Sequence, residues 1–392
     1  MSLDAETSAA PAAPIRRRRP YLYELDLIRS TTFALVIFTH VLAATTDQWG
    51  SHGVNATNLL FHATRNIFFA LTGFVLMYQN LDRDDFSAVD FWRRRIKLVI
   101  VPYAIWSAIY WMVIGMWSNG RGGQIPTSLG EFWGQLSWGT AAFHLYFLFV
   151  MLQVYLLFPL LRLLVAKTRG HHGLVLAGSL LLQVGVVCAI SYWEAPAAWG
   201  PWSRAYATFI PYQLFIVAGA IAADHREQLA AMVRGRGRWL AVALVGTGAL
   251  AIGSYFHRVL DNGAPTNDPN SAFEPTVLPF VMVAVVSIYA MGLHWSTHYR
   301  EGSPRLATAV SYAANRSFPV FLVHVMVMFW ILRATTDSGQ PVILAHVPQP
   351  FGTIVVYLLV VAGSLAVTEI LRRLPGSLYL TGRPRLPLRF MI

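Results

Sequence analysis

Two ionisable residues, Arg29 and His40, lie eleven residues apart in an otherwise apolar stretch between Leu25 and Ala44. On a helix this spacing is roughly 16 Å of rise and about three turns, so both side chains share one face. An ionisable side chain at membrane depth costs about 2.5–3.5 kcal/mol on insertion scales. The pair therefore indicates either a catalytic histidine with an arginine that handles an anion, or charges that face structural partners inside a helix bundle.

Asp26 and His324 are the other candidate catalytic residues. Asp26 precedes Arg29 by one helical turn and can pair with it at the membrane boundary, which is also its purely structural alternative. Histidine can accept and release a proton near neutral pH, which makes His40 the candidate base. His324 lies in the middle of a later apolar segment, where it is either catalytic support or a hydrogen-bonded core residue.

A basic run that includes Arg93 and Arg94 precedes Pro102-Tyr103 at the start of another apolar segment. Arginine side chains match phosphate oxygens with two parallel hydrogen bonds. Together with Arg29 and Tyr103, these arginines would suit a polyanionic cytoplasmic ligand such as the nucleotide end of coenzyme A. The alternative is ordinary positive charge at a cytoplasmic membrane boundary.

Three further residues are candidates for binding a second substrate. Arg65 lies inside the second apolar segment, where it could face His40 or line an acceptor site. His144 falls at the outer edge of the fourth segment, where an interfacial role is the alternative. Gln153 lies in the middle of the same segment and should form hydrogen bonds inside the bundle.

The elements that position these residues are predicted to be membrane-spanning helices. The chain has 392 residues, of which 55% are hydrophobic and only 12% charged, and its mean hydropathy is +0.48. A soluble domain averages about 25% charged residues, so the sequence predicts an all-α, polytopic membrane bundle. We expect about ten spans, near residues 24–44, 59–79, 97–117, 143–163, 173–193, 206–223, 238–256, 275–294, 317–333 and 352–371.

The net charge of +11 follows membrane topology and does not indicate nucleic-acid binding. Most Lys and Arg residues lie in alternate connecting segments, and the positive-inside rule then places both termini in the cytoplasm. We expect a disordered basic arm at 1–20, one membrane domain at 21–374 and an irregular tail at 375–392, as in a multi-pass protein of the bacterial plasma membrane. No metal-ligand spacing, Gly-rich phosphate loop or nucleophile elbow is evident, and no permanently bound cofactor is expected.

In this order the motifs resemble those of the acyltransferase 3 family of bacterial integral-membrane acyltransferases. Each motif alone is loose, but all five in sequence between about residues 21 and 372 are specific. They are Leu25-Asp26-Leu27-Ile28-Arg29 with His40, Phe68-Phe69-Ala70-Leu71-Thr72-Gly73-Phe74, Arg93-Arg94 with Pro102-Tyr103, His144-Leu145-Tyr146-Phe147-Leu148 with Gln153, Tyr155 and Pro159, and Phe321-Leu322-Val323-His324.

The resemblance implies a ten-span enzyme that takes an acyl group, commonly acetyl, from cytoplasmic acyl-CoA. It implies delivery to a hydroxyl, usually of a carbohydrate or glycolipid, at the extracytoplasmic face, either directly or through an extracytoplasmic partner protein. Carried over, His40 would be the catalytic base or acyl relay, and Arg29, Arg93 and Arg94 would hold coenzyme A.

The chain also departs from the family pattern. Met151 and Leu152 occupy positions where many members have glutamate, while Thr72, Tyr146 and Phe321 replace Ser, Trp and Tyr. A carboxylate that could share a proton with the histidine is therefore missing there. The residues alone leave two other functions open: a proton-coupled transporter or flippase for an anionic or glycan substrate, and a structural membrane protein.

Overall fold

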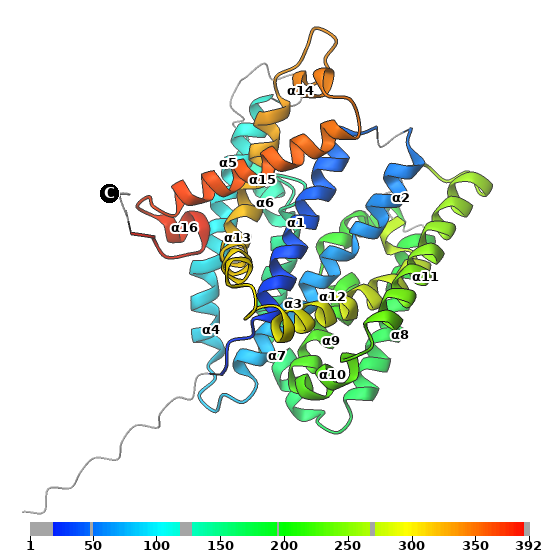
Figure 1. Ribbon diagram of the computed structural model, residues 1–392, viewed down its shortest axis with the longest axis vertical. Helices are drawn as coiled ribbons and strands as arrows, with labels where there is room; N and C mark the ends of the chain where they lie inside the picture. The colour runs from blue at the N-terminus through cyan, green and yellow to red at the C-terminus, as the bar shows by residue number, and fades with distance from the viewer. Residues whose placement is uncertain (1–18, 48–49, 118–127, 194–195, 267–270, 388–392) are drawn as a thin grey trace, which may run out of the picture.

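The protein is described by a computed structural model that covers residues 19–47, 50–117, 128–193, 196–266 and 271–387 (Figure 1). In these ranges the chain is helical, and the only β-type pairing is an isolated bridge between Thr335 and Pro341. The predicted all-α class is confirmed. Most of the arm expected at 1–20 lies outside the described residues.

Nine helical segments within the described ranges are long and apolar enough to cross a membrane. They are α1 (Glu24–Thr45), α2 and α3 (His52–Phe61 and Ala63–Asn80), α4, η1 and α5 (Ala88–Arg95, Ile96–Ile100 and Val101–Trp117), α7 (Tyr146–Lys167), α8 (His172–Tyr192), α11 with η4 (Gly237–Phe256 and His257–Asp261), η6 with α12 (Pro275–Val277 and Leu278–His298), α13 (Pro304–Leu332) and α15 (Phe351–Leu371).

Shorter helices connect these segments. They are α6 (Leu129–Trp138), η2 (Ala197–Ala207), η3 (Ile210–Tyr212), α9 (Gln213–Asp224), α10 (Arg226–Val233), η5 (Ser271–Phe273), α14 (Val342–His346) and α16 (Ser377–Thr381).

The sixth expected span, 206–223, is formed by η3 and α9, which together run only over Ile210–Asp224. This segment rises roughly 24 Å, less than the ~30 Å thickness of a hydrocarbon core. The short length is possible because α9 is an inner helix, with Phe215, Ala220 and Ile221 buried against its neighbours.

Glycines allow α9 to approach α3 closely. A Cβ on Gly73 would lie 2.1 Å from the Ile216 carbonyl oxygen, and one on Gly219 would lie 1.9 Å from the Ala70 carbonyl oxygen. Backbone meets backbone at both positions, as is common where membrane helices pack through small residues. This contact fixes the helix that carries Arg65.

The helix α1 lies inside the bundle, packed against α3, α12, α13 and α15. The outer helices instead expose large apolar side chains, such as Leu181 on α8, Val245 on α11 and Leu358 on α15. Such an apolar exterior is suited to lipid contact. The polar residues discussed below therefore lie in the protein interior or at helix ends.

Two local expectations differ from the structure. The ninth expected span, 317–333, is only the second part of a longer helix, α13, which starts at Pro304 and contains Pro319. The tail expected to be irregular contains α16, whose Leu380 carbonyl accepts a 2.8 Å hydrogen bond from the Trp106 indole on α5. The tail folds because it has a packing partner, which its Pro- and Arg-rich composition does not reveal.

Candidate active site

A pair of histidines from α1 and α13 forms the centre of the site. Nδ1 of His40 lies 2.8 Å from Nε2 of His324, and the two rings are nearly parallel. The other nitrogen of His324, Nδ1, lies 2.7 Å from the carbonyl oxygen of Phe321. The sequence placed both residues at membrane depth, and the structure brings them into direct contact.

These two contacts assign the tautomers of the neutral rings. A carbonyl oxygen only accepts, so Nδ1–H of His324 donates to Phe321 and Nε2 of His324 carries a lone pair. Nδ1–H of His40 then donates to His324, and Nε2 of His40 is left with its lone pair. Because Nε2 of His40 has no hydrogen-bond partner in the described part of the chain, it is the available base.

Tyr110 of α5 helps to shape α13 beside His324. Its hydroxyl donates to the Leu322 carbonyl at 2.8 Å and accepts from the Met326 amide at 3.1 Å. The hydroxyl is thus inserted between two backbone groups that would otherwise bond to each other in the helix. Both Tyr110 and His324 are fully buried, so the position of His324 is set by packing as well as by hydrogen bonds.

His144 joins the histidine pair from the turn before α7. Its ring centroid lies 5.0 Å from that of His324 and 6.5 Å from that of His40. The interfacial alternative for His144 is wrong, because the residue is only 2% exposed. Neither of its ring nitrogens has a hydrogen-bond partner in the described ranges. A buried polar group without a partner costs about 1–3 kcal/mol, so His144 is suited to contact a ligand.

Arg65 lies on the same side of the bundle. Its Nη1 is 3.3 Å from the Tyr146 hydroxyl, and its guanidinium lies over the rings of Tyr212 and Phe273. Its Nε and Nη2 atoms are buried without hydrogen-bond partners among the described residues. Arg65 thus presents donors that a substrate could satisfy, as expected from the sequence.

A cavity of about 460 Å³ connects these groups. Its walls include His40, His144 and Arg65, together with Asn58, whose buried side-chain oxygen has no partner within the described ranges. Ligand sites of this kind are mostly apolar with a few polar groups that orient the ligand. The sequence did not identify Asn58, because asparagine in a short helix usually indicates only local hydrogen bonding.

Gln153 is held away from this cavity. Its Nε2 donates to the Ala207 carbonyl at 2.8 Å, and its Oε1 accepts from the Phe209 amide at 3.0 Å. The expected hydrogen bonding inside the bundle is confirmed. Both ends of its side chain bind the chain before α9, and the role of Gln153 in binding substrate stays a prediction.

Asp26 lies near the other end of α1 and is almost fully buried. Its carboxylate accepts hydrogen bonds from Tyr21 at 2.6 Å and Ser311 at 3.1 Å, and it lies 3.9 Å from Arg29. Burial and the hydrogen bond to Asp26 raise the pKa of Tyr21 to about 12. Asp26 is roughly 21 Å of helix rise from His40 and belongs to a separate hydrogen-bonded cluster, so its catalytic role stays a prediction.

The predicted donor-binding residues are only partly brought together. Arg93 and Arg94 are exposed, and Arg93 pairs with Asp90 at 4.0 Å. Tyr103 is buried and donates its hydroxyl to the Leu136 carbonyl at 2.5 Å, and its role in binding the donor stays a prediction. Arg29 is partly exposed, with an electrostatic interaction that reaches Tyr155 on α7.

Two arginines that the sequence did not single out are electrostatically linked to Arg29: Arg95 acts with it on Tyr155, and Arg383 is affected by its charge. Arg95 stacks on Phe91 and Tyr155, each about 5 Å from its guanidinium. Burial, together with the charges of Arg29 and Arg372, lowers the pKa of Arg383 in the tail. Neighbouring cations repel one another, so this group is suited to an anion. The helical spacing of Phe91 and Arg95 was the available signal, because it places Arg95 on the buried face.

A comparison with protein families bears on this arrangement. A family model described as an acyltransferase domain matches residues 22–373, nearly the whole chain. No curated protein and no solved structure matched significantly. The matched range includes Arg29 and His40 of α1, together with His144 and His324. The chain therefore belongs to the acyltransferase 3 family and is a multi-pass membrane acyltransferase.

Proposed function

We propose that the protein transfers an acyl group, commonly acetyl, from acyl-CoA to a hydroxyl of a carbohydrate or glycolipid. The donor would bind at the predicted cytoplasmic side and the acceptor in the cavity toward the predicted outer side. The observation that carries this proposal is the free lone pair on Nε2 of His40, in the wall of a cavity with unpartnered polar atoms.

In the proposed reaction Nε2 of His40 removes the proton from the acceptor hydroxyl. The oxygen attacks the thioester carbonyl, a C–O bond forms and the C–S bond breaks. The proton on His40 then passes to the departing thiolate. The hydrogen bond from Nδ1–H of His40 to His324 orients the ring and stabilises its positive charge while the proton is held.

The acceptor cavity supports a sugar-sized ligand. Its volume of about 460 Å³ lies within the range of about 300–1,000 Å³ typical of small-molecule sites. Arg65 offers donors, Asn58 an acceptor and His144 one of each, while Phe68 and Phe143 supply apolar wall. A sugar hydroxyl can both donate and accept, so it can satisfy each of these groups.

At the opposite end of α1, Arg29, Arg95 and Arg383 would bind the phosphates of coenzyme A. The flexible arm of the donor would then run along α1 toward His40, as the shared helix face predicts. We propose a bacterial plasma membrane location, with the basic ends in the cytoplasm. An extracytoplasmic partner protein would be an alternative recipient of the acyl group.

The transporter or flippase alternative is not retained, because the family match indicates an acyltransferase. The test uses purified protein in nanodiscs with acetyl-CoA and a panel of oligosaccharides. We expect release of the coenzyme A thiol together with an acetylated sugar. Movement of substrate across the bilayer without any dependence on acyl-CoA would contradict the proposal.

A further inference from the structure

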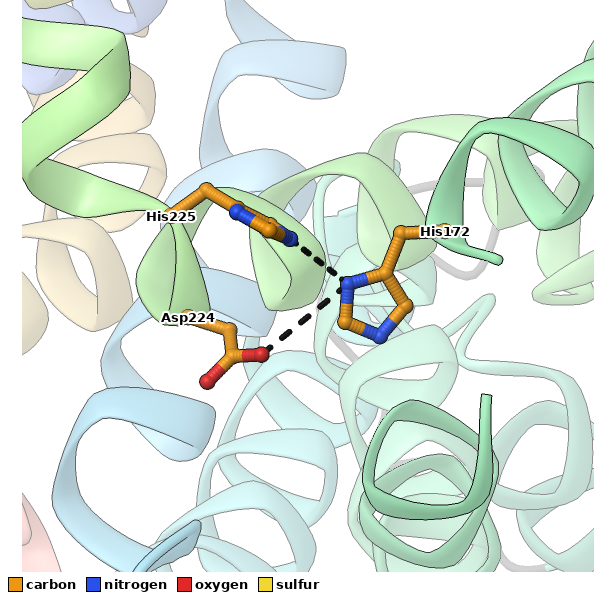
Figure 2. A group of neighbouring side chains, drawn as sticks. All are labelled: His172, Asp224 and His225. Carbon is orange, nitrogen blue, oxygen red and sulfur yellow. Dashed lines mark hydrogen bonds and ion pairs between the residues drawn. The ribbon is translucent and has the colours of Figure 1, made fainter. Parts of the chain in front are cut away.

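A second cluster of histidines lies at the predicted cytoplasmic side, away from the proposed active site. Figure 2 shows His172, Asp224 and His225 pointing toward one another from three different helix ends. His172 begins α8, Asp224 ends α9, and His225 lies between α9 and α10. One ligand atom from each residue lies within 4.8 Å of the others.

The hydrogen bonds of His172 orient the cluster. Its Nε2 lies 2.9 Å from the Val165 carbonyl of α7, so Nε2–H donates and Nδ1 carries the lone pair. That lone pair accepts a hydrogen bond from Nε2–H of His225 at 2.7 Å, and the Asp224 carboxylate lies 3.9 Å from the same nitrogen. Metal-binding histidines typically donate their other N–H to a carbonyl or carboxylate in this way.

We propose that His172, Asp224 and His225 bind a Zn²⁺ ion. Two imidazoles and a carboxylate are a ligand set that zinc uses, and three protein ligands leave a fourth position for water. In a tetrahedral site with bonds of about 2.0–2.1 Å the ligand atoms are roughly 3.4 Å apart. Small side-chain rotations from the observed separations of 2.7 and 3.9 Å would reach that geometry.

Binding would replace the hydrogen bond between the two imidazoles. Without the metal, Nε2–H of His225 donates to His172. With the metal, the proton of His225 moves to its Nδ1 by exchange with solvent, and Nε2 coordinates. Both rings stay neutral, so no proton is released overall.

The surrounding charges are compatible with a cation. Arg169 pairs with the other oxygen of Asp224 at 3.3 Å, and also with Asp82 at 3.2 Å. Asp82 also pairs with Arg19, so the two carboxylates offset the charges of two arginines.

The proposed ion would join α7, α8, α9 and α10 at one point. His172 and His225 also lie at the rim of an apolar cavity of about 630 Å³, lined by α1, α3, α8, α9 and α12. Zinc would thus hold the inner helix α9 at its C-terminus, opposite the end that follows the buried Tyr212. The sequence spacing did not predict this site, because the two histidines are 53 residues apart.

The test is zinc titration of the full chain in nanodiscs, with metal content, melting temperature and the visible spectrum of a Co²⁺ substitute as readouts. We expect one Zn²⁺ per chain, a higher Tm with zinc than with chelator, and a Co²⁺ spectrum typical of tetrahedral coordination. His172→Gln and Asp224→Asn should each weaken zinc binding at least about 100-fold, since even partners outside the coordination shell are worth about 10–100-fold.

Two variants serve as controls. Arg169→Ala removes the ion pair to Asp224 but keeps all three ligands, so it should still bind zinc. His294→Ala removes one member of an exposed histidine pair on α12, where the ring centroids of His294 and His298 are 4.6 Å apart and the pair could bind zinc adventitiously. If His172→Gln fails to fold, Asp224→Asn decides the matter, because Asn preserves the shape of the side chain.

The proposal is overturned if the chain binds no stoichiometric zinc. It is also overturned if Asp224→Asn binds zinc as wild type does, or if His294→Ala alone abolishes binding. None of these readouts depends on acyl transfer, so failure here would leave the proposed function intact.

Discussion

At the scale of single residues, the carbonyl oxygen of Phe321 governs the chemistry available to His40. It accepts from His324, which therefore accepts from His40, and Nε2 of His40 is left as a base. Met151 and Leu152 of α7 supply no carboxylate that could share a proton with a histidine. A neutral histidine, His324, thus fills the position of orienting partner that a carboxylate could take.

The role of His324 can be separated from a role in folding. His324→Ala should lower kcat by about 10- to 100-fold, because hydrogen bonds to a charged group are worth about 1.5–3 kcal/mol. His324→Gln can still accept from Nδ1–H of His40 and should retain more activity than alanine. The measurement is kcat and KM for both variants. Equal losses in the two would argue against a hydrogen-bonding role.

Arg65 should act on the acceptor and not on the donor. Arg65→Gln removes the charge and the unpartnered donors in the cavity, so we expect KM for the acceptor to rise about 10-fold or more, with unchanged affinity for coenzyme A. The control is Arg204→Gln, which alters an outer arginine that stacks on Trp138. A rise in the Kd of coenzyme A in Arg65→Gln would contradict this assignment.

The residue types of this site were predictable, but their contacts were not. His40, His324, His144 and Arg65 stand out because ionisable residues in apolar segments need a reason. Pairing of His40 with His324 depends on the way α1 and α13 pack, which spacing along one helix does not reveal. Gln153 looked equally suitable, yet both ends of its side chain form hydrogen bonds with the backbone.

At the scale of elements, the glycine contact between α3 and α9 should be indispensable. Gly73→Ala and Gly219→Ala each place a Cβ within about 2 Å of a backbone oxygen, so the helices must separate. We expect a loss of about 1–3 kcal/mol in stability, as for other overpacked sites. Gly178→Ala on α8 and Gly246→Ala on α11 are matched controls, because neither added Cβ meets an atom within 4 Å.

The measurement is the melting temperature of each variant in the same detergent. Gly178→Ala and Gly246→Ala should melt close to wild type, while Gly73→Ala and Gly219→Ala should melt lower. Equal melting temperatures for all four would show that α3 and α9 do not pack in this way.

Neighbouring arginines on α4 should differ in their effect on the donor. Arg95 is half-buried against Phe91 and Tyr155, whereas Arg94 faces outward. Arg95→Gln should raise the Kd of coenzyme A about 10- to 100-fold, the value of one or two charge-assisted hydrogen bonds. Arg94→Gln is the matched control and should change it little. A larger effect from Arg94→Gln would place the donor site on the exposed face.

Hydrophobic length predicted most of the helices, because a span needs about twenty apolar residues. Hydrophobic length failed as a predictor where packing against neighbouring helices changes the length that a helix needs. The helix α9 is shorter because it is enclosed by other helices, and α13 includes the more polar residues before Pro319, which were expected to lie outside the ninth span. Arg95 was overlooked because it is part of a run of basic residues at a membrane boundary. The sequence of that run does not show that Arg95 packs against Phe91 and Tyr155.

At the scale of the whole molecule, the two ends of α1 would serve different substrates. Arg29, near the start of α1, belongs to the arginines that would bind the donor phosphates. His40 lies roughly 16 Å of helix rise beyond Arg29, in the wall of the outer cavity. This separation suits an enzyme whose donor and acceptor come from opposite sides of a membrane. Both ends depend on the same helix, which is fixed by its packing against α12, α13 and α15.

The most direct test is the rate of acetyl-CoA thiol release and sugar acetylation by His40→Ala in nanodiscs, beside wild type. A matched control is His346→Ala, which changes an exposed histidine on α14. We predict that His40→Ala keeps the wild-type melting temperature and loses about 10²–10⁴-fold in rate, the usual worth of a general base, while His346→Ala is unaffected. Wild-type acetylation by a folded His40→Ala protein would contradict the account.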